Sequence, residues 1–265
     1  MKTMFKAAAL ALVLSTSFAT ADAFAAETAD FTPAQQARIG EIAAEYLVAH
    51  PDVLIEMSRK LQARQAELQR QALVSAVLHS HRLLMQLDGV PVKGPSGSAV
   101  IVTQFFDYEC SVCSAMAPIM ERVMAANPNV RFAFRDWTIF AGRYQESTMA
   151  SHRGLDVWRQ KGADAYMAYH NGIYRTGHNE GHLTAQDIES VATAAGAGAE
   201  NVSVRSQSDA LIKGNDELAE MLGLTGTPGI IVMPAENATA ANTTVFPGMA
   251  GDKALQEAIA RAAKG

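Results

Sequence analysis

The residues best suited to do chemistry are Cys110 and Cys113, the only cysteines among 265 residues, which stand three positions apart. A disulfide between them would close a very short loop, and such a bridge stabilises a fold weakly because closing it removes little chain entropy. The pair is therefore better explained as a redox couple than as a structural cross-link. A zinc site uses the same spacing but needs four ligands, so that alternative would also require two histidines.

The sequence around the pair predicts the elements that must position it. Residues 99–106 are apolar, β-branched and aromatic, as in a buried strand, and residues 114–126 carry apolar residues at helical spacing. A second strand is predicted at residues 130–134, so the cysteines lie between a strand and a helix. Because a helix N-terminus favours negative charge, we expect Cys110 to be the attacking, more exposed thiolate and Cys113 to resolve the mixed disulfide.

Two uncharged residues, Ser111 and Val112, lie between the cysteines and would tune the redox couple. No histidine stands there to donate a hydrogen bond or carry positive charge to a thiolate. We therefore expect the disulfide to be less strongly oxidising than it would be with such a residue between the cysteines.

A second candidate segment is Gly226-Thr227-Pro228-Gly229, which comes directly before the apolar run of residues 230–232. A proline that opens a strand and is flanked by glycines is a candidate for a cis peptide bond. An ordinary trans turn fits these residues as well, so the pattern alone leaves both open.

Residues 104–113 (QFFDYECSVC), followed far downstream by residues 221–228 (MLGLTGTP), resemble the DsbA family. The resemblance covers about residues 98–263. It implies an α/β thioredoxin fold with a helical insertion, here at about residues 145–222. It also implies that Pro228 is cis and faces the cysteines.

By the same resemblance, the backbone of Thr227, next to Gly226, would pair with a bound substrate chain as a short added strand. With a threonine before this proline, the chain resembles the disulfide isomerases DsbC and DsbG more than DsbA itself. This similarity indicates some isomerase capacity beside oxidase activity.

The sequence departs from the family pattern at two positions. Family members commonly carry an acidic residue where this chain has Gln104, and glutamine cannot shuttle protons to the buried cysteine. Asp107 or Glu109 could take this role, but the alternation along the strand does not fix which side each faces. The second departure is Thr138, where relatives usually have proline.

Residues 26–88 are predicted to be helical and to precede the catalytic domain. Thr32-Pro33 is typical of a helix start, and His50-Pro51 interrupts the helical pattern because the residue before a proline is pushed out of the helical region. The region is similar to the N-terminal extensions of oligomeric relatives such as the ScsC proteins.

Three leucines of the second predicted helix, Leu54, Leu61 and Leu68, fall seven residues apart, which hints at a coiled-coil seam. We therefore expect these helices to join two or three copies of the chain. The alternative is a helix that packs against its own domain.

The start of the chain indicates export. Residues 1–25 have two lysines, then an apolar stretch too short to span a membrane, and end in an A-x-A pattern, as in a secretory signal peptide. The glycine- and proline-rich residues 89–98 are the expected linker, and residues 99–265 the expected catalytic domain.

These features predict a periplasmic enzyme that forms or isomerises disulfide bonds. Its partners would be unfolded or misfolded exported proteins with cysteines and a membrane redox protein. No cofactor beyond the Cys110–Cys113 disulfide and no resident metal are expected, and the net charge of −5 gives no reason to expect a nucleic-acid partner. The alternative is a binding protein that captures a soft metal such as Cu(I) with the same cysteine pair.

Two other groups of residues have simpler explanations. His178 and His182 would share a helix face, but the glycines beside them favour a solvated loop over a metal site. Arg131, Arg135 and Arg143 are expected to be surface charges rather than groups that stabilise a thiolate.

Overall fold

The structure is a computed structural model and describes residues 31–264. The predicted signal peptide, residues 1–25, lies outside the described residues. The chain divides into two compact units, one up to Arg59 and one from Lys60 onward. No helix of residues 31–264 has the length and apolarity required to cross a membrane.

The first helix begins where its sequence predicts. In α1 (Pro33–Ala49), the Thr32 hydroxyl accepts the N–H of Gln35, and the Gln35 side chain accepts the N–H of Thr32. This reciprocal capping satisfies two N–H groups that have no partner within the helix. His50 ends α1, and α2 (Asp52–His79) follows after Pro51, as the His50-Pro51 break predicts.

The last turns of α2 belong to the second unit. Leu73, Val74 and Val77 are buried in the same apolar cluster as Leu84 of the short α3 (His81–Leu84). The compact unit that contains the sheet therefore begins near residue 60, ahead of the linker expected at residues 89–98. The physical reason is that this stretch of helix covers one face of the sheet, a contact that no local pattern reveals.

The second unit is built on a five-stranded mixed sheet of order β1-β3-β2-β4-β5. Its strands are β1 (Val92–Lys93), β2 (Val100–Phe106), β3 (Arg131–Asp136), β4 (Gly229–Pro234) and β5 (Thr244–Phe246). Strands β2 and β3 are parallel, and the other neighbours are antiparallel. This is the mixed sheet of the thioredoxin fold, as predicted, with the unpredicted β1 inside the expected linker.

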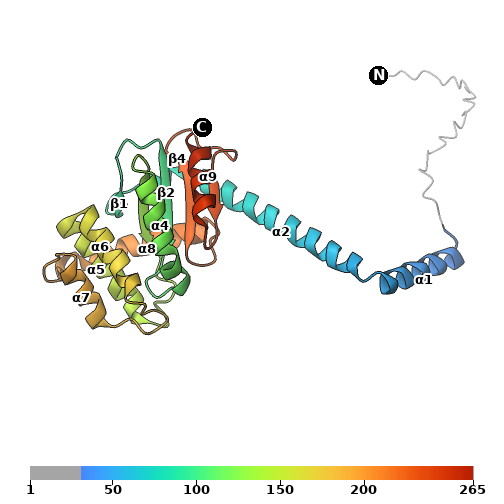
Figure 1. Ribbon diagram of the computed structural model, residues 1–265, viewed down its shortest axis with the longest axis horizontal. Coiled ribbons are helices and arrows are strands. Elements are labelled where there is room, and N and C mark those ends of the chain that lie inside the picture. Colours follow the sequence, from blue (N-terminus) through green and yellow to red (C-terminus); the bar gives the residue numbers. More distant parts are fainter. Residues whose placement is uncertain (1–30, 265) are drawn as a thin grey trace, which may run out of the picture. The chain divides into compact units, whose positions relative to one another are not determined.

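Helices cover both faces of this sheet (Figure 1). The remaining helices are α4 (Ser111–Ala126), α5 (Gln145–Lys161), α6 (Ala163–Arg175), α7 (Ala185–Ala194), a 3-10 turn (Val202–Val204), α8 (Arg205–Met221) and α9 (Asp252–Ala262). Alternate residues of β2 enter different clusters. Val102 and Phe106 pack with α4, α6 and α9, whereas Ile101 and Phe105 pack with α8 and the end of α2. A strand buried on both faces explains the continuous apolar run in the sequence.

The helical insertion, α5 to α8, lies between β3 and β4, and a buried arginine holds part of it together. Arg153 of α5 donates to Asp156, to Glu189 of α7 and to the carbonyl oxygen of Gly198, at 2.6–3.0 Å. A guanidinium this deeply buried is tolerated because its donors have charged or carbonyl partners.

Arg135 is also buried, so the prediction that it is a surface charge is wrong. Its guanidinium donates to Asn215 of α8 at 2.9 Å and to the carbonyl oxygen of Gln86 at 2.8 Å. Burial lowers the pKa of Arg135 to about 10. The side chain joins β3 to α8 and to the segment after α3, and has no contact with the cysteines.

The packing beneath the motif can be tested at Gly154, in α5. A methyl group there would come within 2.9 Å of the Tyr169 ring and 3.1 Å of the Tyr108 hydroxyl. We expect Gly154→Ala to destabilise the protein by about 1–3 kcal/mol because two buried rings must move. The matched control is Gly214→Ala in α8, where a methyl group meets nothing within 4 Å. There the better helix former should stabilise by up to about 1 kcal/mol. Urea unfolding measures both, and equal effects would contradict the packing described.

Candidate active site

The two cysteines lie at the start of α4, where the strand–helix pattern places them. Cys110 is the N-cap residue, and its Sγ accepts the backbone N–H of Cys113 at 3.2 Å. Both thiols are free; Cys110 is 3% exposed and Cys113 is fully buried. The sulfur of Cys110 thus takes the place of the side-chain oxygen that usually caps a helix.

This geometry separates the pKa values of the two thiols. Hydrogen bonding with the Cys113 thiol, helped by the backbone N–H groups of Cys113 and Val112, lowers the pKa of Cys110 to about 7 although burial opposes it. Burial, and then the neighbouring Cys110, raise the pKa of Cys113 well above its usual value. At neutral pH, a substantial fraction of Cys110 is therefore thiolate, while Cys113 holds its proton.

The downstream segment meets the cysteines, as the resemblance implies. The Thr227–Pro228 peptide bond is cis. The thiol of Cys110 donates to the carbonyl oxygen of Thr227 at 3.4 Å. Gly226 and Thr227 are both partly exposed, so a chain that approaches the sulfur also reaches this backbone.

Asp107 fixes the turn between β2 and α4. Its carboxylate accepts the N–H groups of Glu109 and Phe140 and the hydroxyl of Ser147, each at 2.9 Å. Its carbonyl oxygen accepts the hydroxyl of Tyr174 of α6 at 3.1 Å. Three donors occupy the carboxylate, so Asp107 acts as a structural anchor and is a poor candidate for moving protons.

Glu109 is the better candidate of the two predicted substitutes. It is fully buried, and Oε2 accepts the N–H of Gly181 at 2.7 Å while Oε1 has no partner. Burial is the main cause that raises the pKa of Glu109, and the negative charge of Asp107 adds to it. A free carboxyl oxygen and a raised pKa suit a group that takes up and releases protons.

Gln104 lies in the middle of β2, opposite Phe134 of β3 and Ile230 of β4. Its side chain is buried, and neither the amide oxygen nor the amide nitrogen has a partner. A neutral amide there can hold no proton for the cysteines, as predicted from its chemistry.

The sequence analysis missed a buried acid, Asp136, at the end of β3. It lies opposite Phe106 and has no hydrogen-bond partner on either carboxylate oxygen. Burial raises the pKa of Asp136 to about 7. The signal that could have revealed it is its position, because the carboxyl ends of adjacent parallel strands meet at one edge of a sheet.

A second missed residue is His170 of α6, which lies in an aromatic cluster beneath the motif. Its ring contacts Phe106, Tyr166 and Tyr174, and its Nδ1 lies 3.3 Å from the Tyr108 hydroxyl. Burial lowers the pKa of His170 to about 3, so it packs as a neutral side chain. The cluster supports the segment that leads to Cys110.

The two residues between the cysteines differ in their surroundings. Val112 is 42% exposed, whereas the Ser111 hydroxyl donates to Glu180 at 2.5 Å. Glu180 belongs to the loop of the insertion that also carries His178 and His182, so this loop lies at the active site. Sequence reasoning recognised the loop from its glycines but had no signal for its location.

The histidines of this loop are not joined into a metal site. His178 pairs with Asp187 at 2.9 Å, and within residues 31–264 no group of three or more His, Cys, Asp or Glu side chains is arranged to hold a metal ion.

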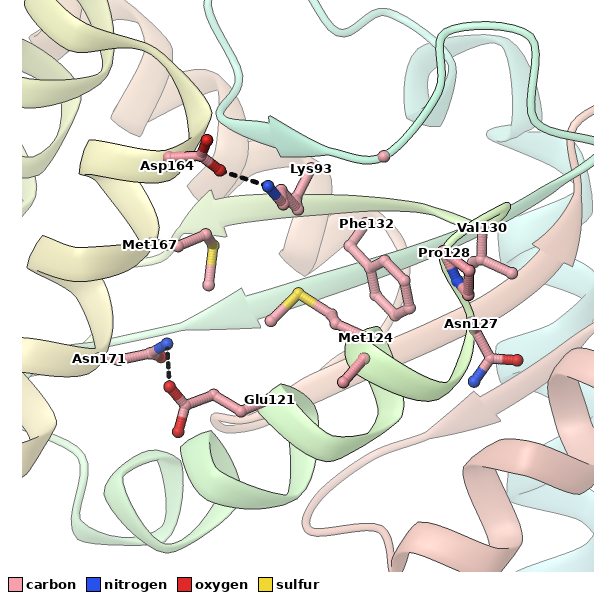
Figure 2. Close-up of a pocket in the computed structure, with 12 residues that line it drawn as sticks. Lys93, Glu121, Met124, Asn127, Pro128, Val130, Phe132, Asp164, Met167 and Asn171 are labelled. Atoms are coloured by element: carbon pink, nitrogen blue, oxygen red, sulfur yellow. Dashed lines mark hydrogen bonds and ion pairs between the residues drawn. The ribbon is translucent and has the colours of Figure 1, made fainter.

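Away from the cysteines, a hollow of about 560 Å³ lies at the other end of α4. Figure 2 shows Met124, Phe132 and Met167 around it, with the Lys93–Asp164 ion pair at its rim. Its volume is within the range of small-ligand pockets, but the charged groups at the rim satisfy one another.

The fold, the helix-capping cysteine and the adjacent cis-proline define a thioredoxin-fold thiol–disulfide oxidoreductase. Residues 101–260 match the DSBA-like thioredoxin domain, and the chain belongs to this family. Residues 35–67 match a second model, described as the copper resistance protein ScsC N-terminal domain. A search of curated proteins gives no match.

Solved structures agree with this assignment. BcfH of Salmonella enterica Typhimurium is 34% identical, with a TM-score of 0.75 over 88% of this chain and 97% of that chain. ScsC of Proteus mirabilis, in a transitional conformation, is 23% identical, with a TM-score of 0.60 over 89% and 99%. A periplasmic thioredoxin-like protein of Salmonella enterica serovar Typhimurium is 21% identical, with a TM-score of 0.57 over 71% and 97%. The last two show the fold alone.

The separated pKa values predict how the reduced protein reacts with iodoacetamide. Alkylation should modify Cys110 alone, with a rate that rises with pH and is half-maximal near pH 7. Cys113→Ala should move this midpoint to a higher pH, because the hydrogen bond with the Cys113 thiol, which is the main cause of the lowered pKa of Cys110, is lost. Mass spectrometry of the alkylated peptide identifies the site. Modification of Cys113 first, or a midpoint near that of an ordinary cysteine, would contradict the geometry.

Proposed function

We propose that this protein forms and isomerises disulfide bonds in exported proteins, in the periplasm, through Cys110 and Cys113. The observation that carries the proposal is the Cys110 sulfur at the N-terminus of α4, 3.4 Å from the carbonyl oxygen of Thr227. An activated sulfur and a backbone acceptor of a partly exposed residue lie side by side there, as capture of a cysteine-containing chain requires.

In the oxidase direction, a substrate thiolate attacks Sγ of Cys110 in the disulfide form, and the Cys110–Cys113 bond breaks. Cys113 leaves and is protonated, and a mixed disulfide joins Cys110 to the substrate. A second substrate thiolate then attacks the substrate sulfur and releases Cys110. The substrate loses two electrons and two protons, and the cysteine pair gains both electrons. A membrane-bound thiol oxidoreductase is the partner that would accept these electrons and restore the disulfide.

In the isomerase direction, the Cys110 thiolate attacks a wrong substrate disulfide and releases one substrate thiolate. A different thiolate of the same chain then attacks the substrate sulfur of the mixed disulfide, which forms a new disulfide within the substrate and releases the Cys110 thiolate unchanged. No net electrons move. The lowered pKa of Cys110 supports this step, because the reduced pair then carries an attacking thiolate at neutral pH. Cys113 provides the escape route when a mixed disulfide fails to rearrange.

Substrate binding at the Thr227 backbone favours extended chains. A carbonyl beside the reactive sulfur can accept an N–H from a substrate segment that lies as an added strand. Such pairing depends on the substrate backbone and not on its side chains, and it needs an extended segment. Unfolded or misfolded proteins with cysteines are therefore the proposed substrates. The reaction needs no cofactor beyond the cysteine pair.

The N-terminal helices support association of two or three copies. Leu54, Leu61 and Leu68 are each more than half exposed, although leucines in seven-residue spacing are typical of a helix seam. Apolar residues of α1, among them Ile39, Ile42 and Tyr46, are also about half exposed. Exposed apolar side chains on both helices are typical of surfaces that bind another protein. The match to the ScsC N-terminal domain over residues 35–67 points the same way.

Export to the periplasm is supported by the pattern of residues 1–25. The Salmonella relative that shares the fold is itself described as periplasmic. An oxidising compartment also suits a thiol pair whose task is to make disulfides in other proteins.

A second candidate, capture of Cu(I) by the same cysteines, is favoured by one observation. The N-terminal match is to a domain described from a copper resistance protein. Two thiolates are suitable ligands for Cu(I), but Cys113 is fully buried and keeps its proton, which weakens the pair as a metal site.

The enzyme proposal is tested with reduced and scrambled ribonuclease. Cys110→Ala should abolish both oxidation and reshuffling, since the attacking sulfur is lost. Cys113→Ala should stop oxidation and leave trapped mixed disulfides. Retention of both activities in Cys110→Ala would refute the proposal. A parent protein that binds Cu(I) tightly and has neither activity would favour the second candidate.

The association proposal is tested on the leucine seam within the full chain. Leu61→Glu should convert the oligomer to a monomer and reduce reshuffling of scrambled ribonuclease, because a second active site is no longer held nearby. The matched control, Ala63→Glu, places the same charge about half a helical turn away on α2 and should keep the oligomer. Light scattering during gel filtration gives the mass. A monomeric parent, or equal dissociation of both variants, would contradict the assignment.

A further inference from the structure

The loop of residues 176–182 is tied to the active-site segment by three hydrogen bonds. The N–H of Glu180 donates to the carbonyl oxygen of Glu109 at 3.0 Å, and the N–H of Gly181 donates to the Glu109 carboxylate at 2.7 Å. The third bond runs from the Ser111 hydroxyl to the Glu180 carboxylate at 2.5 Å. The insertion thereby reaches both residues that flank Cys110.

The backbone of this loop is held in a shape that other sequences would not adopt readily. Glu180 has φ +53° and Gly181 has φ +91°, both in the left-handed region. A Cβ at Gly181 would come within 2.6 Å of the Tyr144 ring. The loop thus rests against Tyr144, and the Glu180 side chain is directed to Ser111 by a constrained backbone and not by chance.

The contact has an electrostatic consequence. Ser111 is the first residue of α4, so the Glu180 carboxylate lies at the same helix N-terminus that stabilises the Cys110 thiolate. Two negative groups at one helix end repel each other, which disfavours the thiolate. The Ser111 hydroxyl also gives its hydrogen to Glu180 and therefore cannot donate it to the Cys110 sulfur.

Charged groups of both signs lie around this point. The negative charges of Asp107 and Glu146 act on Glu109, and His182 acts on it in the opposite direction. The Arg143 guanidinium lies 5.7 Å from the centre of the Tyr144 ring, against which Gly181 rests. His178 of the same loop is already paired with Asp187.

We propose that Glu180 is a positioning and tuning residue that acts through Ser111 and holds the Cys110–Cys113 couple less oxidising than the motif alone would make it. The proposal deepens the function proposed above by naming what sets the redox balance of the same site. It rests on the redox chemistry of the pair and not on which substrates the pair serves.

The test is the equilibrium of the full-length protein with glutathione, together with a pH titration of thiolate absorbance at 240 nm. Glu180→Gln keeps a hydrogen-bond acceptor for Ser111 and removes the charge. We expect the equilibrium constant to shift about two- to fivefold towards the more oxidising side, roughly 9–21 mV for a two-electron couple. The Cys110 thiolate should form at a lower pH than in the parent protein.

Two further variants separate tuning from a structural role. In a Ser111→Ala background, Glu180→Gln should shift the equilibrium less, because the carboxylate has lost the contact that places it. Glu257→Gln, in the exposed Lys253–Glu257 pair of α9, removes a remote charge and should leave the potential unchanged.

An unchanged potential in Glu180→Gln, an equal shift in Glu257→Gln, or a shift towards the reducing side would overturn the proposal. Neither measurement needs a protein substrate. Loss of the ribonuclease activities therefore bears on the proposed function, and the glutathione equilibrium bears on Glu180.

Discussion

The catalytic domain depends on one interaction, the cap that the Cys110 sulfur places on α4. The first N–H groups of any helix lack partners in the helix and must find an acceptor elsewhere. Here the acceptor is the reactive atom, since the N–H of Cys113 points at Cys110 Sγ. The same hydrogen bond, from the Cys113 N–H to the Cys110 sulfur, therefore caps the start of α4 and stabilises the Cys110 thiolate.

Other parts of the domain keep this cap in place. Asp107 closes the turn before it, and Tyr174 reaches from the insertion to the Asp107 carbonyl oxygen. The aromatic cluster around His170 fills the space below, so the insertion is part of the support of the active site and not an appendage. The carbonyl oxygen of Thr227 meets the sulfur from the loop that leads into β4, the strand beside β2. Segments from the sheet, the insertion and the proline loop thus converge on one sulfur atom.

The sequence predicted the parts of this arrangement that follow local patterns. The strand before Cys110, the helix after it and the capped start at Thr32 each depend on residues within one or two turns. The parts it missed depend on distant packing. The apolar face of residues 73–84 reads as an ordinary amphipathic helix until the sheet that covers it is known. Asp136 and His170 are unremarkable in the sequence, and only the meeting of β3 and α6 makes them buried.

Charged residues illustrate the same limit. Arg135 and Arg153 lie in segments that read as polar, and their burial becomes possible only because carbonyl and carboxylate partners arrive from elsewhere. The loop of His178 and Glu180 was correctly interpreted as a loop from its glycines. That its backbone would join Glu109, far away in sequence, has no local signature. A local sequence pattern can predict a helix, strand or loop. The contacts that give a residue its role come from segments that are distant in sequence and meet only in the folded protein.

The full burial of Cys113 beside a nearly buried Cys110 also bears on damage by oxidants. A sulfur that reacts with peroxide becomes a sulfenic acid, and a second encounter carries it to an irreversible state unless a thiol intervenes first. In this protein the intervening thiol is internal, on the next turn of the same helix, and is itself shielded from the oxidant. Condensation returns the pair to its disulfide with loss of water, so the arrangement that makes the couple reactive also protects it from permanent loss.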